Sequence, residues 1–315
     1  MEVSSGSKIG VVIVTYNRLK LLSNLLSKLE KQTEKIESIL IFDNDSTDGT
    51  KEYLEDIGYK NFTDREKEDK RLYYKNDLNI GGAGGFSKVI ELVRKIDVDY
   101  VWIMDDDVGP EEDCLEKLMS KIRSEKIDVA IPSRDDENYS DRICTGIDMK
   151  NYKKFWTTLR KTFQSRPYNE EIYWVEDMTF EGPLVSKKII DKVGIPDSSY
   201  FIFFDDTDYA RRLRKYSKIA YVTTAVLHRE LAKKTTNIDR PYNWREYYSI
   251  RNNILFDKKY GETWKVKLLS PHLLMLHLLV ISLRRGHFKN NFYIIIKAWF
   301  DGIRGKRGKV LDPNY

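Results

Sequence analysis

Cysteine is nearly absent from this sequence, which bears on disulfide-stabilised scaffolds and on zinc sites with thiolate ligands. The two cysteines, Cys114 and Cys144, lie far apart, and neither belongs to a closely spaced pair. A disulfide-stabilised scaffold is therefore excluded and a thiolate zinc site is disfavoured. The N-terminus also lacks a basic segment followed by an apolar one, which is the pattern of a secretory signal. These absences lead us to expect a cytoplasmic protein.

Long hydrophobic runs, internal repeats and linker-like segments are also lacking over most of the chain. Of the 315 residues, 41% are hydrophobic and 33% are charged, so neither a disordered chain nor a multi-span membrane protein is expected. No proline- or serine-rich linker interrupts residues 1–260. We predict one catalytic domain over residues 1–260 and a helical, basic region over residues 261–315.

The N-terminal half alternates between strand and helix patterns. Residues 9–15 form a continuous apolar run, as expected for a strand buried on both faces of a parallel sheet, and leucines recur at helical spacing over 19–29. Strands at 38–42 and 71–75 and a helix at 51–57 follow. This order predicts an α/β protein with a mostly parallel sheet flanked by helices. The later predicted elements are helices at 86–96, 186–193 and 205–216 and strands at 100–104, 129–132, 172–175 and 219–226.

Polar side chains follow several of these predicted strands. Asp43 follows the second strand, Asn79 follows the third, and an acidic triplet at residues 105–107 follows the fourth. Ligands of open α/β sheets bind beyond the carboxyl ends of the strands. We therefore expect these residues to belong to one site.

The acidic triplet Asp105-Asp106-Asp107 is a candidate metal site. Side chains alternate along extended backbone, so Asp105 and Asp107 are predicted to share a face while Asp106 points elsewhere. Carboxylate oxygens suit Mn²⁺ or Mg²⁺, whose other positions can be filled by water and diphosphate oxygens. The alternative is a solvated acidic turn that caps a helix beginning near Glu111.

Five motifs follow one another with specific order and spacing over about residues 9–230. They are Val-Val-Ile-Val-Thr-Tyr-Asn-Arg at 11–18, Asp-Asn-Asp-Ser-Thr-Asp-Gly-Thr at 43–50, Asn79 with the glycine cluster at 81–85, the acidic triplet, and Phe-Asp-Asp-Thr-Asp at 204–208. Together they resemble family 2 glycosyltransferases, which have the GT-A fold, a Rossmann-like fold of nucleotide-diphospho-sugar transferases. The form Asn-Ile-Gly-Gly-Ala-Gly-Gly-Phe resembles bacterial galactofuranosyltransferases and some rhamnosyltransferases.

This resemblance implies how a UDP-sugar donor is bound. A carboxylate at a strand end, such as that of Asp43, can accept hydrogen bonds from uracil or ribose, although it could also only cap the turn. Glycines permit close approach of the backbone to a ligand before a helix N-terminus, or serve conformation alone. The expected nucleotide-sugar contacts are Thr15, Arg18, Asp43, Asn79, Gly81, Gly82, Asp105 and Asp106.

The segment Phe-Phe-Asp-Asp-Thr-Asp is the candidate source of the general base. An aromatic run places carboxylates at the start of a predicted helix, where a helix-dipole interaction is the structural alternative. The family pattern assigns the base to the second member of the acidic pair, so Asp206 is favoured and Asp205 comes second. Asp208 is expected to support the helix or its neighbours.

Further site residues follow from the resemblance or from composition. By the resemblance, His228 could complete the metal shell with Asp105 and Asp107. Tyr248, Arg251 and Asn252 could face the acceptor or its phosphate, with core packing as an equal alternative. Sugar sites often combine an aromatic face with carboxylates, which suggests acceptor or sugar contacts for Trp174, Glu176 and Asp177.

The predicted function is an inverting, metal-dependent sugar transfer. The favoured donor is UDP-galactofuranose, followed by dTDP-rhamnose or a UDP-hexopyranose, and the expected acceptor is a hydroxyl of a glycan or lipid-linked glycan in cell-surface polysaccharide synthesis. A nucleotidyltransferase would need a basic, glycine-rich signature after the first strand, which residues 15–19 lack. A non-catalytic homologue that binds a nucleotide sugar or a glycan is the alternative from another class.

The C-terminal region is apolar and basic. Residues 268–283 are strongly apolar but number about sixteen and include a proline, which is short for a bilayer-spanning helix of about twenty residues. A second apolar stretch at 292–300 precedes a basic tail. These helices could pack on the domain, form a homo-oligomer, or contact the inner face of the plasma membrane as a peripheral surface. Nucleic-acid binding is not expected, because the basic residues accompany apolar ones.

Overall fold

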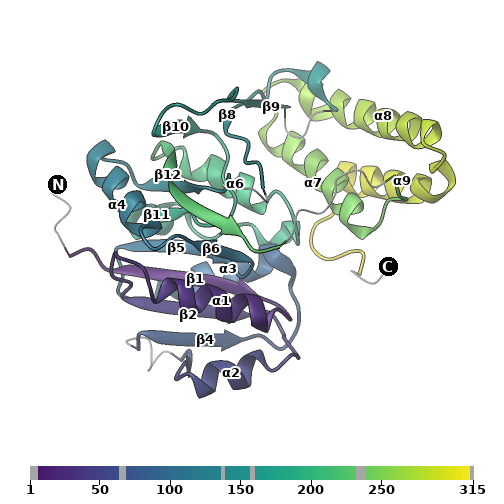
Figure 1. Ribbon diagram of the computed structural model, residues 1–315. Coiled ribbons are helices and arrows are strands. Elements are labelled where there is room, and N and C mark those ends of the chain that lie inside the picture. Colours follow the sequence, from purple (N-terminus) through teal and green to yellow (C-terminus); the bar gives the residue numbers. More distant parts are fainter. Residues whose placement is uncertain (1–5, 64–68, 136–138, 157–159, 232–238, 313–315) are drawn as a thin grey trace.

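The structure is a computed structural model that describes residues 6–63, 69–135, 139–156, 160–231 and 239–312. Its core is a ten-stranded mixed sheet with helices on both faces (Figure 1). The central strand β1 (Ile9–Thr15) pairs in parallel with β2 (Ser38–Asp43) and β5 (Tyr100–Asp105). All of β1 is buried, as its apolar run predicts. The strand order is β10 (Ile172–Val175), β12 (Ile219–Arg229), β7 (Val129–Ser133), β11 (Leu184–Ser186), β5, β1, β2, β4 (Arg71–Lys75) and β3 (Lys60–Asn61).

The strand register aligns the polar residues that follow the strands. Thr15 at the end of β1 pairs with Asp43 at the end of β2, while Val14 pairs with Asp105 at the end of β5. The ends of these three parallel strands therefore meet at one edge of the sheet, as predicted. Antiparallel additions complete the sheet: β11 pairs with β5 and β7, and β10 pairs with β12.

The helices cover the sheet in two layers. On one face α1 (Leu19–Leu29), α2 (Thr50–Asp56) and α4 (Cys114–Glu125) bury their leucines in one apolar cluster. On the other face α3 (Gly81–Val93) and α5 (Lys187–Val193) join α6 (Asp205–Leu213) in a second cluster. Both layers hide the apolar faces that the helical spacing of the sequence predicts.

Short strands near the site were not predicted from the sequence. β6 (Val108–Pro110) pairs antiparallel with the end of β12 directly after the acidic triplet. β8 (Cys144–Ile147) and β9 (Lys161–Phe163) form a separate antiparallel pair. Elements of three or four residues give too few positions for a periodic signal, which explains why they were missed.

A helical layer of α7, α8 and α9 stands beside the sheet (Figure 1). The layer comprises α7 (Trp244–Tyr260), a π-helical turn (Lys265–Leu269), α8 (Ser270–Arg284) and α9 (Phe288–Arg304). The predicted boundary at residue 260 coincides with the end of α7. However, α7 packs against α9, and the Tyr247 hydroxyl donates a 2.7 Å hydrogen bond to Asp301.

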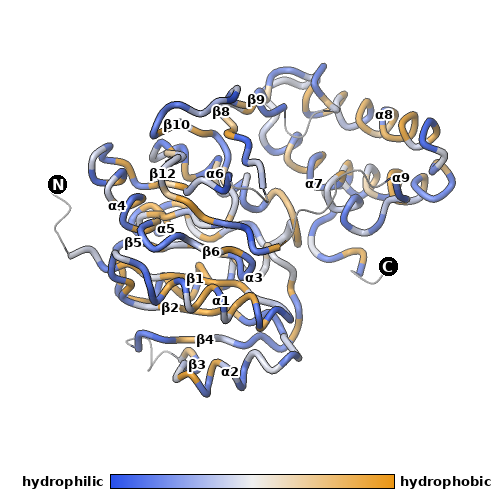
Figure 2. The backbone as a smooth tube through the Cα atoms, viewed as in Figure 1, coloured by the Kyte–Doolittle hydropathy of each residue, from blue (hydrophilic) through white to orange (hydrophobic). Residues whose placement is uncertain are grey.

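The apolar helix is longer than the sequence pattern predicted. The π-helical turn and α8 form 20 continuous helical residues, Lys265–Arg284, long and apolar enough to cross a membrane by length and composition. Figure 2 shows the hydrophobic colouring of this helix at the outer side of the helical layer. Only 28% of the apolar 18-residue stretch of this helix is buried within the protein, so much of its apolar surface faces outward.

Candidate active site

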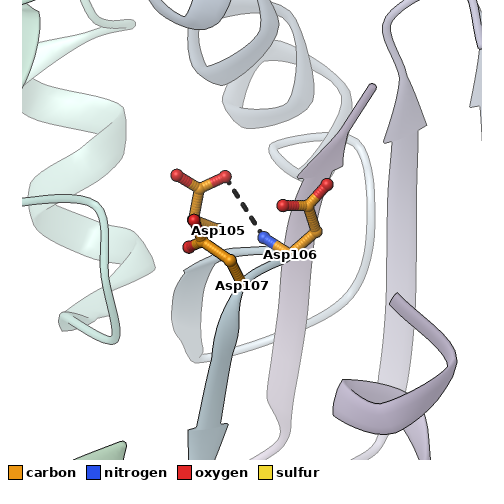
Figure 3. A group of neighbouring side chains, drawn as sticks. All are labelled: Asp105, Asp106 and Asp107. Carbon is orange, nitrogen blue, oxygen red and sulfur yellow. Dashed lines mark hydrogen bonds between the residues drawn. The ribbon is translucent and has the colours of Figure 1, made fainter. Parts of the chain in front are cut away.

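The acidic triplet lies where β5 ends. Figure 3 shows the carboxylates of Asp105 and Asp107 on one side and that of Asp106 turned toward the neighbouring strand, the arrangement that backbone alternation predicts. The Asp106 amide donates a 3.1 Å hydrogen bond to Asp105 Oδ1. A carboxylate oxygen from each of the three residues lies within 4.8 Å of the others. This spacing would let a single cation contact more than one carboxylate.

Asp106 is tied to the loop after β1. Its Oδ2 accepts a 2.8 Å hydrogen bond from the Thr15 hydroxyl, and its Oδ1 accepts a 2.8 Å bond from the Arg18 guanidinium. The same guanidinium nitrogen donates to Asp107 Oδ2 at 3.0 Å. Thr15 and Arg18, both expected to contact the nucleotide, therefore also fix the orientation of the triplet.

The electrostatics of the triplet favour a bound cation. Burial raises the pKa of each of the three aspartates, while the Arg18 charge opposes this effect. Repulsion within the triplet raises the pKa of Asp105 and Asp106 further, and the Glu181 charge does so for Asp107. Among the described residues, the buried Asp107 Oδ1 has no hydrogen-bond partner. A divalent cation with a preference for oxygen ligands would satisfy that oxygen and keep the carboxylates ionised, so these residues fit Mn²⁺ or Mg²⁺.

The end of β2 provides a second polar group. Asp43 is fully buried, its Oδ1 accepts a 2.8 Å hydrogen bond from the Ser46 amide, and its Oδ2 has no partner among the described residues. Asn44, which sequence reasoning did not single out, donates to Asn79 Oδ1 at 3.2 Å and accepts from the Ile80 amide at 3.0 Å. Asn44 thus joins the end of β2 to the glycine cluster.

The glycine cluster forms the first turn of α3, where the sequence predicted a helix from residue 86. Gly81 has a φ of +79°, and a Cβ there would lie 2.4 Å from the Phe201 carbonyl oxygen. A Cβ on Gly85 would lie 2.7 Å from the Val14 side chain. These two glycines are needed for close packing, whereas a Cβ on Gly82 would meet nothing within 4 Å. Of the two glycines predicted to contact the nucleotide sugar, Gly81 and Gly82, only Gly82 therefore has open space next to its Cα.

Asp206 lines a cavity of about 390 Å³ at the start of α6. The residues that line this Asp206 cavity are Lys161, Asp177, Thr179, Phe203, Phe204, Asp206, Thr207, Arg240, Arg245, Glu246 and Ser249. Its size is within the usual range of small-molecule sites, about 300–1,000 Å³. Of the predicted sugar contacts, Asp177 lines the cavity together with Asp206.

The pKa of Asp206 is raised to about 6, chiefly by burial and then by the nearby Asp177 charge, while the Lys161 charge opposes the shift. A carboxylate with a pKa near the working pH can take a proton and still release it, which is what a general base must do. Asp206 therefore combines access to a cavity with suitable basicity.

The two neighbouring aspartates of α6 have different environments. Burial and the Asp206 charge raise the pKa of Asp205 well above its usual value, which disfavours its charged form. Asp208 is fully buried and accepts hydrogen bonds from Lys259 at 2.6 Å and from Tyr260 at 2.8 Å. Asp208 thus anchors α6 to α7, the supporting role expected for it.

The loop that delivers Asp206 is held in an unusual conformation. Phe201, Phe203 and Phe204 have φ values of +69°, +65° and +74°, a region that costs non-glycine residues roughly 1–2 kcal/mol each. The Asn252 side-chain amide donates to the carbonyl oxygens of Tyr200, Ile202 and Phe203 at 3.1, 2.7 and 3.1 Å. Arg251 donates to the Tyr200 carbonyl at 2.9 Å. Arg251 and Asn252 are both fully buried and make structural contacts, which is the packing alternative of the sequence prediction.

Replacement of Asn252 by alanine is expected to lower kcat by about ten- to a hundredfold, because small displacements of a catalytic group have effects of that size. The affinity for UDP should stay near the wild-type value, since the hydrogen bonds of the Asn252 side chain go to the Asp206 loop and to Arg251, not to the triplet. The matched control is Asn253→Ala at the next, half-buried position of α7. Calorimetry for UDP and steady-state kinetics separate the two effects, and equal kcat in both variants would contradict a positioning role.

The remaining predicted residues lie apart from the cavity. Trp174 is on the outer strand β10, 40% exposed, with the Lys218 ammonium 4.9 Å from its ring centroid. Glu176 accepts from the Ile147 amide at 2.9 Å and pairs with Arg214. His228 lies 3.3 Å from Glu111, outside the triplet, and its metal role remains a prediction.

Two residues close to the triplet were missed by sequence reasoning. Glu181 and Arg229 both influence the pKa of Asp107, and the two side chains pair at 3.3 Å. Neither belongs to a recognisable motif, and long-range pairing across the sheet brings them together. The Glu181 charge also raises the pKa of Asp206. Because the charge of Glu181 acts on both Asp107 and Asp206, the triplet and the cavity lie near each other.

Comparison with known proteins gives a consistent result. The model of the family described as Glycosyl transferase family 2 matches residues 10–194. Galactofuranosyltransferase GlfT2 of Mycolicibacterium smegmatis is 22% identical over 292 residues, covering 85% of this chain and 43% of that protein. Galactofuranosyltransferase GlfT1 of the same organism is 24% identical over 203 residues, 64% of either chain. The chain therefore spans less than two thirds of the length of these relatives.

Solved structures show the same architecture at lower identity. GalNAc-T7 with UDP, GalNAc and Mn²⁺ has a TM-score of 0.58 at 11% identity, over 94% of this chain and 57% of that one. Mannosyltransferase PcManGT from Pyrobaculum calidifontis, in complex with GDP-Man and Mn²⁺, has a TM-score of 0.56 at 13% identity, over 95% and 88% of the two chains. These likenesses confirm the predicted GT-A fold.

Proposed function

This chain belongs to glycosyl transferase family 2, and from that membership we propose that it is an inverting, metal-dependent transferase that moves a sugar from a UDP-sugar to an acceptor hydroxyl. One observation supports this proposal most strongly. A carboxylate with a pKa of about 6, that of Asp206, lines a cavity next to an acidic triplet with an unpartnered oxygen. The proposed base, Asp206, and the acidic triplet are separate groups. One can therefore act on the acceptor and the other on the donor, as transfer between two substrates requires.

The proposed reaction is a single displacement. Asp206 accepts the proton of the acceptor hydroxyl while that oxygen attacks the anomeric carbon of the donor sugar. The bond from the anomeric carbon to the diphosphate oxygen breaks, and UDP leaves with the bonding electrons. Attack opposite to the leaving group inverts the anomeric configuration.

The triplet would hold the cation through Asp105 and Asp107. When bound, the cation supplies positive charge to the diphosphate of the departing UDP. Arg18 holds Asp106 and Asp107 in place, and Asp43 has an oxygen available for the nucleotide. Two solved structures with this fold, GalNAc-T7 and PcManGT, contain Mn²⁺, in line with this assignment.

UDP-galactofuranose is the proposed donor. The support comes from the glycine-cluster form and from relatives named galactofuranosyltransferases at 22% and 24% identity. A screen of purified protein against UDP-galactofuranose, UDP-galactopyranose, UDP-glucose and dTDP-rhamnose, with nucleotide release as the readout, tests the choice. Release of UDP from UDP-galactofuranose well above the other donors is expected. Selective turnover of dTDP-rhamnose would transfer the assignment to a rhamnosyltransferase.

We propose that the outer side of the helical layer contacts an anionic membrane on the cytoplasmic face. Exposed apolar side chains line this surface and basic ones flank it at both ends, a combination that suits lipid headgroups above an apolar interior. His272 of α8 and Trp299 of α9 are in contact at 5.5 Å between ring centroids, which joins the two helices on that side. The apolar members are Leu268, Leu276, Val280, Leu283, Phe292 and Phe300, and the basic members are Lys265, Lys267, Arg284, Arg285, Lys289 and Arg304.

Replacement of both Leu276 and Leu283 by aspartate is expected to lower binding to phosphatidylglycerol-containing vesicles by about tenfold or more, because each exposed leucine that enters an apolar phase contributes roughly 1.5–3 kcal/mol. The matched control is Tyr216→Asp, an exposed aromatic residue far from the helical layer. Vesicle sedimentation measures the effect. Unchanged sedimentation with a shift from dimer to monomer in the variant would instead assign the surface to a homo-oligomer.

A further inference from the structure

The Asp206 cavity, taken as the acceptor site, is lined by three cationic side chains that the proposed chemistry does not use. Lys161, Arg240 and Arg245 all line it, from β9, from the segment before α7 and from the first turn of α7. Two of the three have carboxylate partners. Lys161 pairs with Asp177, and Arg240 pairs with Glu246 at 2.7 Å.

Arg245 is different from these two. Among the described residues no carboxylate lies within ion-pair distance of its guanidinium, which contacts the rings of Phe203 and Trp244, each at 5.3 Å from the ring centroid. Arg245 is an exposed residue at the surface of the cavity. Partial burial of its guanidinium, followed by the charges of Arg18 and Arg240, lowers its pKa, although Glu246 opposes the shift. Of the three cationic side chains that line the cavity, Arg245 is therefore the one for which the described residues offer no carboxylate partner.

The Glu246 carboxylate cannot turn to neutralise Arg245 without cost. It accepts from the Asn243 amide at 2.7 Å as part of the capping box of α7, and it also accepts from Arg240. Breaking the box would remove hydrogen bonds from the first turn of the helix. The positive end of the α7 dipole adds to the local potential, because Arg245 lies in that first turn.

We propose that the acceptor bears a phosphate group, which binds to the Arg245 guanidinium while the acceptor hydroxyl lies at Asp206. Arginine presents planar N–H donors that match phosphate oxygens. The contact of Arg245 with the Phe203 ring holds its guanidinium in one orientation. Phe203 and Phe204 offer apolar surface between the two polar ends. An acceptor that spans the cavity would thereby be fixed at both ends, with one hydroxyl next to the base.

This inference rests on the proposed function, because it takes Asp206 as the base and the cavity as the acceptor site. It goes further in naming the chemistry of the acceptor, a phosphorylated glycan. The phosphate could come from a lipid-linked glycan or from a soluble sugar phosphate, which share this headgroup chemistry. Donor phosphates are expected at the triplet, whose carboxylates Arg18 contacts.

The test uses the full chain saturated with UDP and Mn²⁺, which fills the donor side. Glucose 1-phosphate and methyl glucoside are titrated as matched charged and neutral probes, with ligand-observed NMR as the readout. We expect glucose 1-phosphate to bind and Arg245→Ala to weaken it about tenfold or more, the effect of losing a charge-assisted hydrogen bond. Arg245→Lys should retain part of the affinity, and octyl phosphate should bind more tightly than glucose 1-phosphate if the source is a lipid.

The controls separate this inference from the proposed function. Lys215→Ala removes an exposed charge at the end of α6 and should change nothing. UDP affinity should be equal in wild type and Arg245→Ala. Equal binding of glucose 1-phosphate to both proteins, or equal binding of the charged and neutral probes, would overturn the phosphate assignment while leaving UDP binding intact. If the wild-type chain did not bind UDP, that result would instead contradict the proposed function.

Discussion

Replacement of Asp206 by asparagine is expected to lower kcat about a hundred- to ten-thousand-fold, the range that a general base contributes. Asparagine keeps the shape of the side chain but cannot accept the acceptor proton. Affinity for UDP in the presence of Mn²⁺ should be unchanged, because the triplet is untouched. Steady-state transfer assays and calorimetry for UDP measure the two quantities on the same preparation.

Asp205→Asn is the matched control. Because burial raises the pKa of Asp205 and disfavours its charged form, a neutral amide is expected to be tolerated there, and activity should stay within a few-fold of the wild type. If Asp205→Asn were inactive and Asp206→Asn active, the base would be Asp205, the second residue of the predicted pair.

The pH dependence of transfer provides a further check on Asp206. A base must be ionised to accept a proton, so kcat/KM should fall as pH drops below about 6, the pKa of Asp206, and be flat above it. Asp177→Asn removes a charge that raises this pKa and should move the acidic limb to lower pH. A limb that stays in place in Asp177→Asn would show that another group titrates.

Replacement of Asp107 by alanine is expected to weaken Mn²⁺-dependent UDP binding by about a hundredfold or more, because a bound cation contributes several kcal/mol to interactions with a diphosphate. The buried Oδ1 of Asp107 has no partner within the described residues, which makes it the carboxylate oxygen most available to a cation. Glu112→Ala, an exposed acidic residue close in sequence, is the charge-matched control. UDP titration in Mn²⁺ measures both variants, and equal affinities would remove Asp107 from the metal site.

The sequence predicted the sheet and the strand-end site well because their signals are local. Buried apolar runs such as residues 9–15 mark central strands, and parallel register then aligns Asp43 with the triplet without further information. The pair Asp205 and Asp206 was found because it begins a helix after an aromatic run. These features depend on short stretches of chain, which a single sequence displays.

The rest of the site depends on contacts between distant segments. Asn252 holds the Asp206 loop from about fifty residues away, and Glu181 reaches the triplet through strand pairing. Arg245 shows its lack of a carboxylate partner only when its surroundings are known. Likewise, the glycine cluster begins α3 because the chain packs against Phe201, a contact that no local pattern predicts.

The proposed chemistry depends above all on the acidic triplet binding UDP through a divalent cation. The most direct test is calorimetric titration of UDP into the wild-type chain, once with Mn²⁺ and once with excess chelator. We expect UDP to bind in Mn²⁺ and its affinity to fall by about a hundredfold or more when the cation is removed. Equal affinity for UDP under both conditions would contradict it.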